Sequence, residues 1–179
     1  PKCTFEVLKI ASKLKKKVVI GTTGFSKTEE NHIKKFSNKI SILKAGNMSL
    51  GINLLMFLTE ITSKTLGNNY LSKVFEVHHK HKKDHPSGTA LMLGDSIANG
   101  RNQKLDKLKV ISKVGNRKKT KKGKITFNSF RKGNVVGDHK IIFSSKDEVI
   151  ELSHEALDRG IFATGAIQAV LWGLSLIHI

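Results

Sequence analysis

The chain has 179 residues, and its 32 Lys and Arg against 14 Asp and Glu give a formal net charge of +18 at pH 7. This length allows one or two small domains with a real core, and 39% hydrophobic residues is ordinary for a soluble protein. No apolar run has the length of a membrane span, no signal peptide is visible, and the single Cys3 excludes an internal disulfide framework and fits a reducing cytoplasm.

The excess of positive charge has two interpretations. It can indicate a surface that binds nucleic acid, or a lysine-rich solvated surface without a specific partner. The lysines are scattered over the whole chain, and only thinly spread Phe residues could stack on bases. We therefore favour the solvated surface and expect neither nucleic acid nor a membrane as a partner.

The first residues predict a helix, a strand and a turn. Residues 4–15 carry apolar side chains at three-residue steps, which indicates an amphipathic helix. Val18–Ile20 is a short apolar run typical of a buried parallel strand. Gly21–Gly24 then forms a small flexible turn. Together these elements make half of a βαβ unit, and ligands bind at the carboxyl ends of such strands.

The next residues repeat this order. Ser26 and Glu29 form a capping box that predicts a following helix. Residues 40–45 are expected to form a strand, with a loop at residues 46–49 after its carboxyl end. A long apolar helix is predicted over residues 50–66, closed by Gly67.

Residues 76–93 combine ionisable side chains with a helix start. The alternation of residues 75–79 predicts the end of a strand, and Pro86–Thr89 is typical of a helix N-terminus, where Ser and Thr can cap free amides. Leu91, Met92, Ile97 and Ala98 supply that helix with an apolar side. The strand thus delivers two histidines and a lysine to a helix N-terminus that favours anions. Acid catalysis on a small acidic substrate is the chemistry that this pattern indicates.

The rest of the chain predicts a sheet and a last helix. The segment 100–124 is rich in lysine and is expected to be a solvated loop. Strands are expected at 125–130, 135–143 and 149–154, in an antiparallel or mixed sheet. Arg131 and His139 could be functional, but we favour their interpretation as residues on the surface of these strands. The last helix is expected over residues 158–172.

These motifs resemble a known family. Residues 76–90, which include Glu-Val-His-His, Lys-His-Lys and Pro-Ser-Gly-Thr-Ala, are similar to the signature of the dihydrodipicolinate reductases, enzymes of bacterial lysine biosynthesis. Residues 19–25 are similar to the turn on the nicotinamide side in that family, and residues 45–55 to its second cofactor loop. Residues 131–139 and 158–163 also look like this family.

The resemblance implies a fold and a division into domains. The fold would be α/β, with part of a doubly wound, Rossmann-like dinucleotide-binding domain and an α+β domain with a mixed sheet for substrate binding and oligomerisation. Residues 1–49 would belong to the first and residues 50–157 to the second, and the helix at 158–173 would return to the first. Residues 174–179 do not match the family tail. We also expect that the chain lacks the N-terminal part of the cofactor domain, including its glycine-rich loop.

The resemblance also implies an activity and roles for single residues. The reaction would be hydride transfer from NADH or NADPH to a cyclic unsaturated dicarboxylate, in a cytoplasmic homotetramer. His78 would donate a proton with the help of Lys82, and substrate contacts would come from His79, Gly88 and Thr89. The residues implied to contact the cofactor are Gly21, Thr22, Thr23, Ala45, Gly46, Asn47 and Met48.

Three alternatives accompany this interpretation. The crowded His78, His79, His81, Asp84 and His85 could in principle bind a metal, but their spacing is not His-Glu-x-x-His and lysines surround them, so we expect no metal. The chain could be a catalytically silent piece of the enzyme. It could also be a basic module that binds nucleic acid through residues 113–124.

Overall fold

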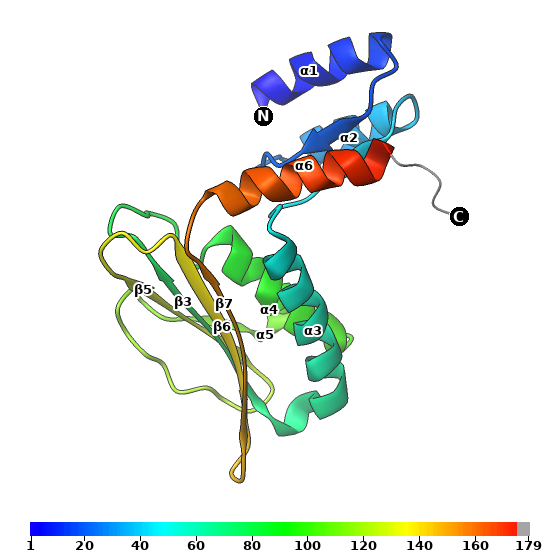
Figure 1. Ribbon diagram of the computed structural model, residues 1–179. Coiled ribbons are helices and arrows are strands. Elements are labelled where there is room, and N and C mark those ends of the chain that lie inside the picture. Colours follow the sequence, from blue (N-terminus) through cyan, green and yellow to red (C-terminus); the bar gives the residue numbers. More distant parts are fainter. Residues whose placement is uncertain (175–179) are drawn as a thin grey trace. The chain divides into compact units, whose positions relative to one another are not determined.

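The computed structural model describes residues 1–174 and divides into two compact units (Figure 1). The first unit consists of Pro1–Ser49 together with the chain from Gly160 onward, and the second is Leu50–Arg159. The tail expected at residues 174–179 lies outside the described residues, apart from Leu174 at the end of the last helix.

The first unit contains two parallel strands and three helices. Strand β1 (Val18–Ile20) pairs with β2 (Ile42–Lys44) in a register that sets Val18 beside Ile42. The helices are α1 (Lys2–Lys13), α2 (Lys27–Ser37) and α6 (Gly160–Leu174). Their small core holds the buried side chains of Leu8, Ala11, Ile20, Ile33 and Ile40. The predicted capping box is present, because Ser26 and Glu29 exchange hydrogen bonds at the start of α2.

The second unit is a five-stranded mixed sheet in the order β4-β5-β3-β6-β7. Its strands are β3 (Leu71–His78), β4 (Lys109–Ile111), β5 (Ile125–Arg131), β6 (Gly137–Ser144) and β7 (Val149–Ala156). Strands β4, β5 and β3 run parallel, and β6 and β7 add antiparallel neighbours, which confirms the predicted mixed sheet.

Helices cover one face of this sheet (Figure 1). They are α3 (Leu50–Leu66), α4 (Gly88–Gly100) and the short α5 (Leu105–Leu108), with a 3-10 turn η1 (Gly67–Asn69) after α3. The core between helices and sheet contains Ile52, Val74, Leu93, Ile97, Phe127, Ile141 and Phe143. The central strand β3 alternates buried and half-buried residues, as a strand with one covered face should.

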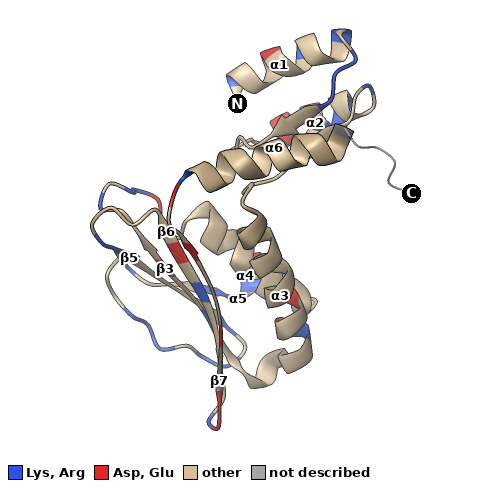
Figure 2. Ribbon diagram, in the orientation of Figure 1, with Lys and Arg blue, Asp and Glu red and all other residues tan. Residues whose placement is uncertain are grey.

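The lysine-rich segment is more ordered than its sequence predicts. Helix α5 and strand β4 lie within the stretch expected to be a loop, because Leu105 and Leu108 are buried in the core and β4 pairs with β5. These elements are only a few residues long, too short for a periodic pattern to show. Residues 113–119 after β4 are exposed, as predicted, and Lys and Arg are spread over helices and loops of both units (Figure 2). No helix among the described residues is long and apolar enough to cross a membrane.

Candidate active site

A row of polar side chains crosses the helix-covered face of the sheet near the end of β3. Glu76 lies in β3, and the register sets Ser129 of β5 and His139 of β6 directly beside it. All three are buried, with exposed fractions of 1%, 1% and 4%. Buried polar side chains need partners, so this row marks a built site within an otherwise apolar face.

The Glu76 carboxylate is the centre of this row. Its Oε1 accepts hydrogen bonds from the Ser129 hydroxyl at 2.6 Å and from the Ser87 backbone amide at 3.0 Å. Its Oε2 lies 3.1 Å from His78 Nε2. Burial alone would raise the pKa of this carboxyl, but hydrogen bonds from His78, Ser129 and Ser87 outweigh burial and lower the pKa to about 2. Glu76 therefore carries a negative charge inside the protein.

His78 ends strand β3 and is buried on the same face, two residues after Glu76. One ring nitrogen, Nε2, faces Glu76, and the other, Nδ1, lies 3.2 Å from the carbonyl oxygen of Val136. His79 follows beyond the strand and is half-buried. The two adjacent histidines thus have different surroundings, as the alternation of a strand predicts.

The structure corrects the interpretation of His139 as a strand-surface residue. It is buried, its ring lies edge-on to the His78 ring with 5.0 Å between centroids, and its Nε2 lies 3.4 Å from the Ser87 hydroxyl. Burial, reinforced by the nearby His78, lowers the pKa of His139 to about 4. The sequence could not show this, because either face of β6 could have been the covered one.

The N-terminus of helix α4 is anchored on this row. Ser87 caps the helix, accepting the Ala90 amide at 3.1 Å, while the Ser87 amide donates to Glu76. Gly88 is exposed, and a Cβ built there would meet nothing within 4 Å. The predicted anion site of Gly88 and Thr89 therefore lies at an open helix N-terminus beside Glu76 and His78.

The loop that carries Lys82 is held by strand β5. Arg131 donates hydrogen bonds to the carbonyls of Lys82 at 3.0 Å and of Asp84 at 2.7 Å. The Lys82 ammonium forms an ion pair of 2.9 Å with Asp84. Arg131, which the sequence predicted to be a strand-surface residue, instead organises the segment between β3 and α4.

Positive charges surround the half-buried His79. Its pKa is lowered by partial desolvation and then by the charges of Arg159, His78, His81 and Lys82. Desolvation is the larger cause, and the nearby cationic groups add to it. These cationic groups favour an anionic ligand near His79.

Glu76, His78 and His139 could also hold a metal ion, since one ligand atom from each lies within 4.8 Å of the others. This set differs from the one that the sequence suggested, with only His78 in common. The Glu76 carboxylate is already saturated by Ser87, Ser129 and His78. The absence of a metal stays a prediction.

The predicted cofactor residues of the first unit lie on two neighbouring loops. Because β1 and β2 are parallel, Gly21–Thr23 and Ala45–Met48 follow the carboxyl ends of adjacent strands, and the Ala45 amide donates to the Ile20 carbonyl at 3.2 Å. Gly21, Thr22 and Thr23 are exposed and small. Such an edge leaves backbone groups accessible to a dinucleotide, so these residues fit the expected cofactor.

Helix α6 packs closely against the second of these loops. A Cβ at Gly165 would lie 1.8 Å from the Met48 carbonyl oxygen, so a side chain has no room there. The Met48 side chain in turn covers Gly21. Met48 Cγ would lie 3.6 Å from a Cβ built at Gly21. The last helix therefore fixes the loop that is predicted to contact the cofactor.

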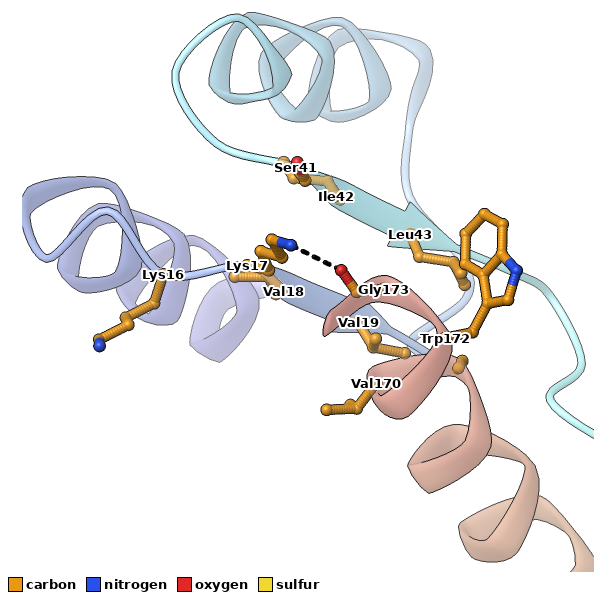
Figure 3. A pocket seen from close by; sticks show the side chains of 11 residues that line it. Lys16, Lys17, Val18, Val19, Ser41, Ile42, Leu43, Val170, Trp172 and Gly173 are labelled. Carbon is orange, nitrogen blue, oxygen red and sulfur yellow. Dashed lines mark hydrogen bonds between the residues drawn. The ribbon is translucent and has the colours of Figure 1, made fainter. Parts of the chain in front are cut away.

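A separate apolar pocket of about 290 Å³ lies at the amino ends of the same strands (Figure 3). Val19, Leu43 and Trp172 line it, and Lys17 donates a hydrogen bond of 2.7 Å to the Gly173 carbonyl. It contains none of the predicted cofactor residues. Ligands of open α/β sheets bind at the carboxyl ends, so this pocket is not the expected cofactor site.

Comparisons with known proteins agree with these features. Residues 51–178 match the family model for dihydrodipicolinate reductase, C-terminus, and residues 1–48 match the model for its N-terminus. A 4-hydroxy-tetrahydrodipicolinate reductase from Pelagibacter ubique is 63% identical over 96% of this chain and 67% of its own length. One from Buchnera aphidicola subsp. Baizongia pistaciae is 41% identical over 96% of the chain and 63% of its own length. The chain thus spans about two thirds of these relatives.

A solved structure shares the fold. The dihydrodipicolinate reductase from Paenisporosarcina sp. TG-14, solved with dipicolinate bound, superposes with a TM-score of 0.72 at 23% identity, over 96% of this chain and 65% of that one.

The parallel strand pair with its loops and the mixed sheet with its buried histidines define an α/β protein with a partial Rossmann-like unit and an α+β unit. With both family models matched, the chain belongs to the dihydrodipicolinate reductase family.

Proposed function

We propose that the protein carrying this chain is a 4-hydroxy-tetrahydrodipicolinate reductase, an NAD(P)H-dependent oxidoreductase of lysine and diaminopimelate biosynthesis. The observation that carries this proposal is the 63% identity with the Pelagibacter ubique relative over 96% of the chain. The first unit would bind NADH or NADPH, and the second the cyclic dicarboxylate. The reaction would yield tetrahydrodipicolinate.

The cofactor, when bound, supplies the hydride. Gly21, Thr22, Thr23 and the loop Ala45–Met48 would contact it at the carboxyl ends of β1 and β2. Gly21, Thr22 and Thr23 are small and exposed, and α6 supports the loop from behind, which favours this role.

Gly88, Thr89 and His79 would bind the carboxylates of the substrate. The open N-terminus of α4 supplies a positive dipole end, and the charges that lower the pKa of His79 create a potential that attracts a dianion. The dipicolinate bound to the Paenisporosarcina enzyme is a ligand of this chemistry.

His78 would deliver the proton that hydride transfer requires, with Lys82 sustaining the positive potential. A histidine can hold and release a proton near neutral pH, and His78 lies beside the α4 N-terminus through Glu76 and Ser87. Lys82 is held in place by Asp84 and by the bonds of Arg131 to the loop.

The test is steady-state kinetics of a full-length protein that carries this chain. His78→Gln and Lys82→Ala should each lower kcat by roughly 10²–10⁴-fold, with cofactor affinity near normal. His79→Gln should act mainly on KM, because its role is binding. A His78→Gln enzyme that keeps most of its kcat would remove His78 from the acid role.

We further propose a cytoplasmic homotetramer. The face of the sheet opposite the helices supports subunit contact, since Phe75 and Phe130 lie half-buried there with ring centroids 5.0 Å apart. Light scattering on the full-length protein should give four times the chain mass. A monomer at assay concentration would contradict this proposal.

A further inference from the structure

We propose that Glu76 is the positioning residue for His78, and that its carboxylate and the Val136 carbonyl together hold the His78 ring at both of its nitrogens. The inference rests on the proposed function, in which His78 is the acid. It adds a residue with no role so far.

The partners of the ring carry the argument. His78 Nε2 lies 3.1 Å from a Glu76 carboxylate oxygen, and Nδ1 lies 3.2 Å from the carbonyl oxygen of Val136. A carboxylate and a carbonyl both only accept hydrogen bonds. The two acceptors face the two ring nitrogens and so fix the orientation of the ring.

Glu76 is itself immobile, which a positioning residue requires. The Ser129 hydroxyl and the Ser87 amide hold it from β5 and from the start of α4. The Gly137 backbone packs against another side of the ring. A Cβ built at Gly137 would come within 3.1 Å of His78 Cε1, so the absence of a side chain there makes room for the ring. Ring and carboxylate are therefore fixed by three strands and a helix N-terminus.

The carboxylate beside the ring is charged. Glu76 is ionised and the neighbouring His139 is neutral at pH 7, since burial keeps the pKa of His139 at about 4. Other charged and titratable groups on the packed elements include Lys82 with Asp84 in the loop, Arg131 on β5, Asp138 on β6, and His154 and Glu155 on β7.

The bond between His78 Nε2 and the ionised Glu76 carboxylate is charge-assisted and roughly twice as strong as a bond between neutral groups. Loss of the carboxylate charge should therefore leave the ring less firmly oriented.

A double-mutant cycle in the full-length protein tests the positioning role. Glu76→Gln keeps the size of the side chain and removes its charge, and should lower kcat within the range of about 10²–10⁴-fold seen on loss of a general acid. In a His78→Gln background the same change should cost nothing further, because Glu76 acts through His78. Glu60→Gln, an exposed site on α3, is the matched control and should leave kcat unchanged.

Nitrogen NMR of labelled histidine gives a readout independent of activity. The nitrogen signals of His78 should shift in Glu76→Gln, because Nε2 loses its charged hydrogen-bond partner. If that variant does not fold, Ser129→Ala, which removes one donor to Glu76, should show a smaller change in the same direction.

Either of two results would overturn the inference. One is an unchanged His78 nitrogen spectrum in Glu76→Gln, and the other is an additive loss of kcat in the double variant. If instead His78→Gln retains kcat while the nitrogen spectra are as expected, the acid role of His78 fails and its positioning by Glu76 stands. Zinc binding that depends on Glu76 would also overturn the inference, because it would assign the cluster to a metal.

Discussion

The guanidinium of Arg131 donates a hydrogen bond of 3.0 Å to the backbone carbonyl of Lys82, so a strand side chain fixes the loop that carries a proposed catalytic residue. A second bond of 2.7 Å reaches the Asp84 carbonyl. The fork of Arg serves both carbonyls at once.

Arg131→Ala should loosen this loop and lower kcat/KM about tenfold, which corresponds to roughly 1.4 kcal/mol, the net worth of one or two hydrogen bonds. Arg131→Lys should recover little, because an ammonium lacks the planar fork. Steady-state kinetics of the full-length protein measures both. Lys132→Ala, an exposed neighbour, is the control. Wild-type kinetics in Arg131→Ala would show that the loop keeps its position without this residue.

His139 should make the protein sensitive to acid. Its pKa is about 4 in the folded state against an ordinary 6.5, so the unfolded chain binds this proton more readily. Stability is complete above pH 6.5 and falls as the pH decreases from 6.5 to 4, by about 3 kcal/mol for this group. Glu76, with a pKa of about 2 against 4.5, adds a further loss as the pH falls from 4.5 to 2.

Urea unfolding of the full-length protein at a series of pH values measures this dependence. His139→Gln should flatten the slope between pH 6.5 and 4 and leave the loss below pH 4.5 in place. His32→Gln, an exposed histidine on α2, is the matched control. An unchanged slope in His139→Gln would mean that another group causes the acid sensitivity.

Gly165 should tolerate no side chain. A Cβ there would overlap the Met48 carbonyl, so Gly165→Ala should displace the Ala45–Met48 loop and cost roughly 1–3 kcal/mol of stability. As a consequence, cofactor affinity should fall by roughly tenfold or more.

The same helix contains another glycine, Gly173, whose substitution should raise stability rather than lower it. A Cβ at Gly173 would meet nothing within 4 Å, so Gly173→Ala should stabilise α6 by roughly 0.5–1 kcal/mol. Denaturant unfolding and fluorescence titration with NADH and NADPH measure both variants. Equal effects of the two substitutions would contradict the packing argument.

Gly88→Val should raise the KM for the dicarboxylate strongly and change folding little. The place of a Cβ at Gly88 is open, so the chain itself leaves room for a side chain there. A bound carboxylate at the α4 N-terminus would need the same space. Titration with dipicolinate and steady-state kinetics measure the effect. An unchanged KM would place the substrate elsewhere, and a loss of cofactor affinity would show that the change is not local.

The sequence by itself determined the local elements and supplied the candidate site residues. The apolar run of β1, the capping box of Ser26 and Glu29, the long helix α3 and the start of α4 were predicted because each depends on neighbours within a few residues. The signature at residues 76–90 identified His78 and the α4 N-terminus for the same reason, since its members are close in the chain.

Tertiary structure alone decided what surrounds those residues. Ser129 and His139 lie more than 50 positions from Glu76 and reach it through the register of β5 and β6. Which face of a strand is buried depends on where the helices pack, and a shift of one residue would turn His139 to the other face. For this reason the fold, rather than any local pattern, decides three features of the site. They are the charge of Glu76, the neutral state of His139 and the hydrogen bond from Arg131 to the Lys82 loop.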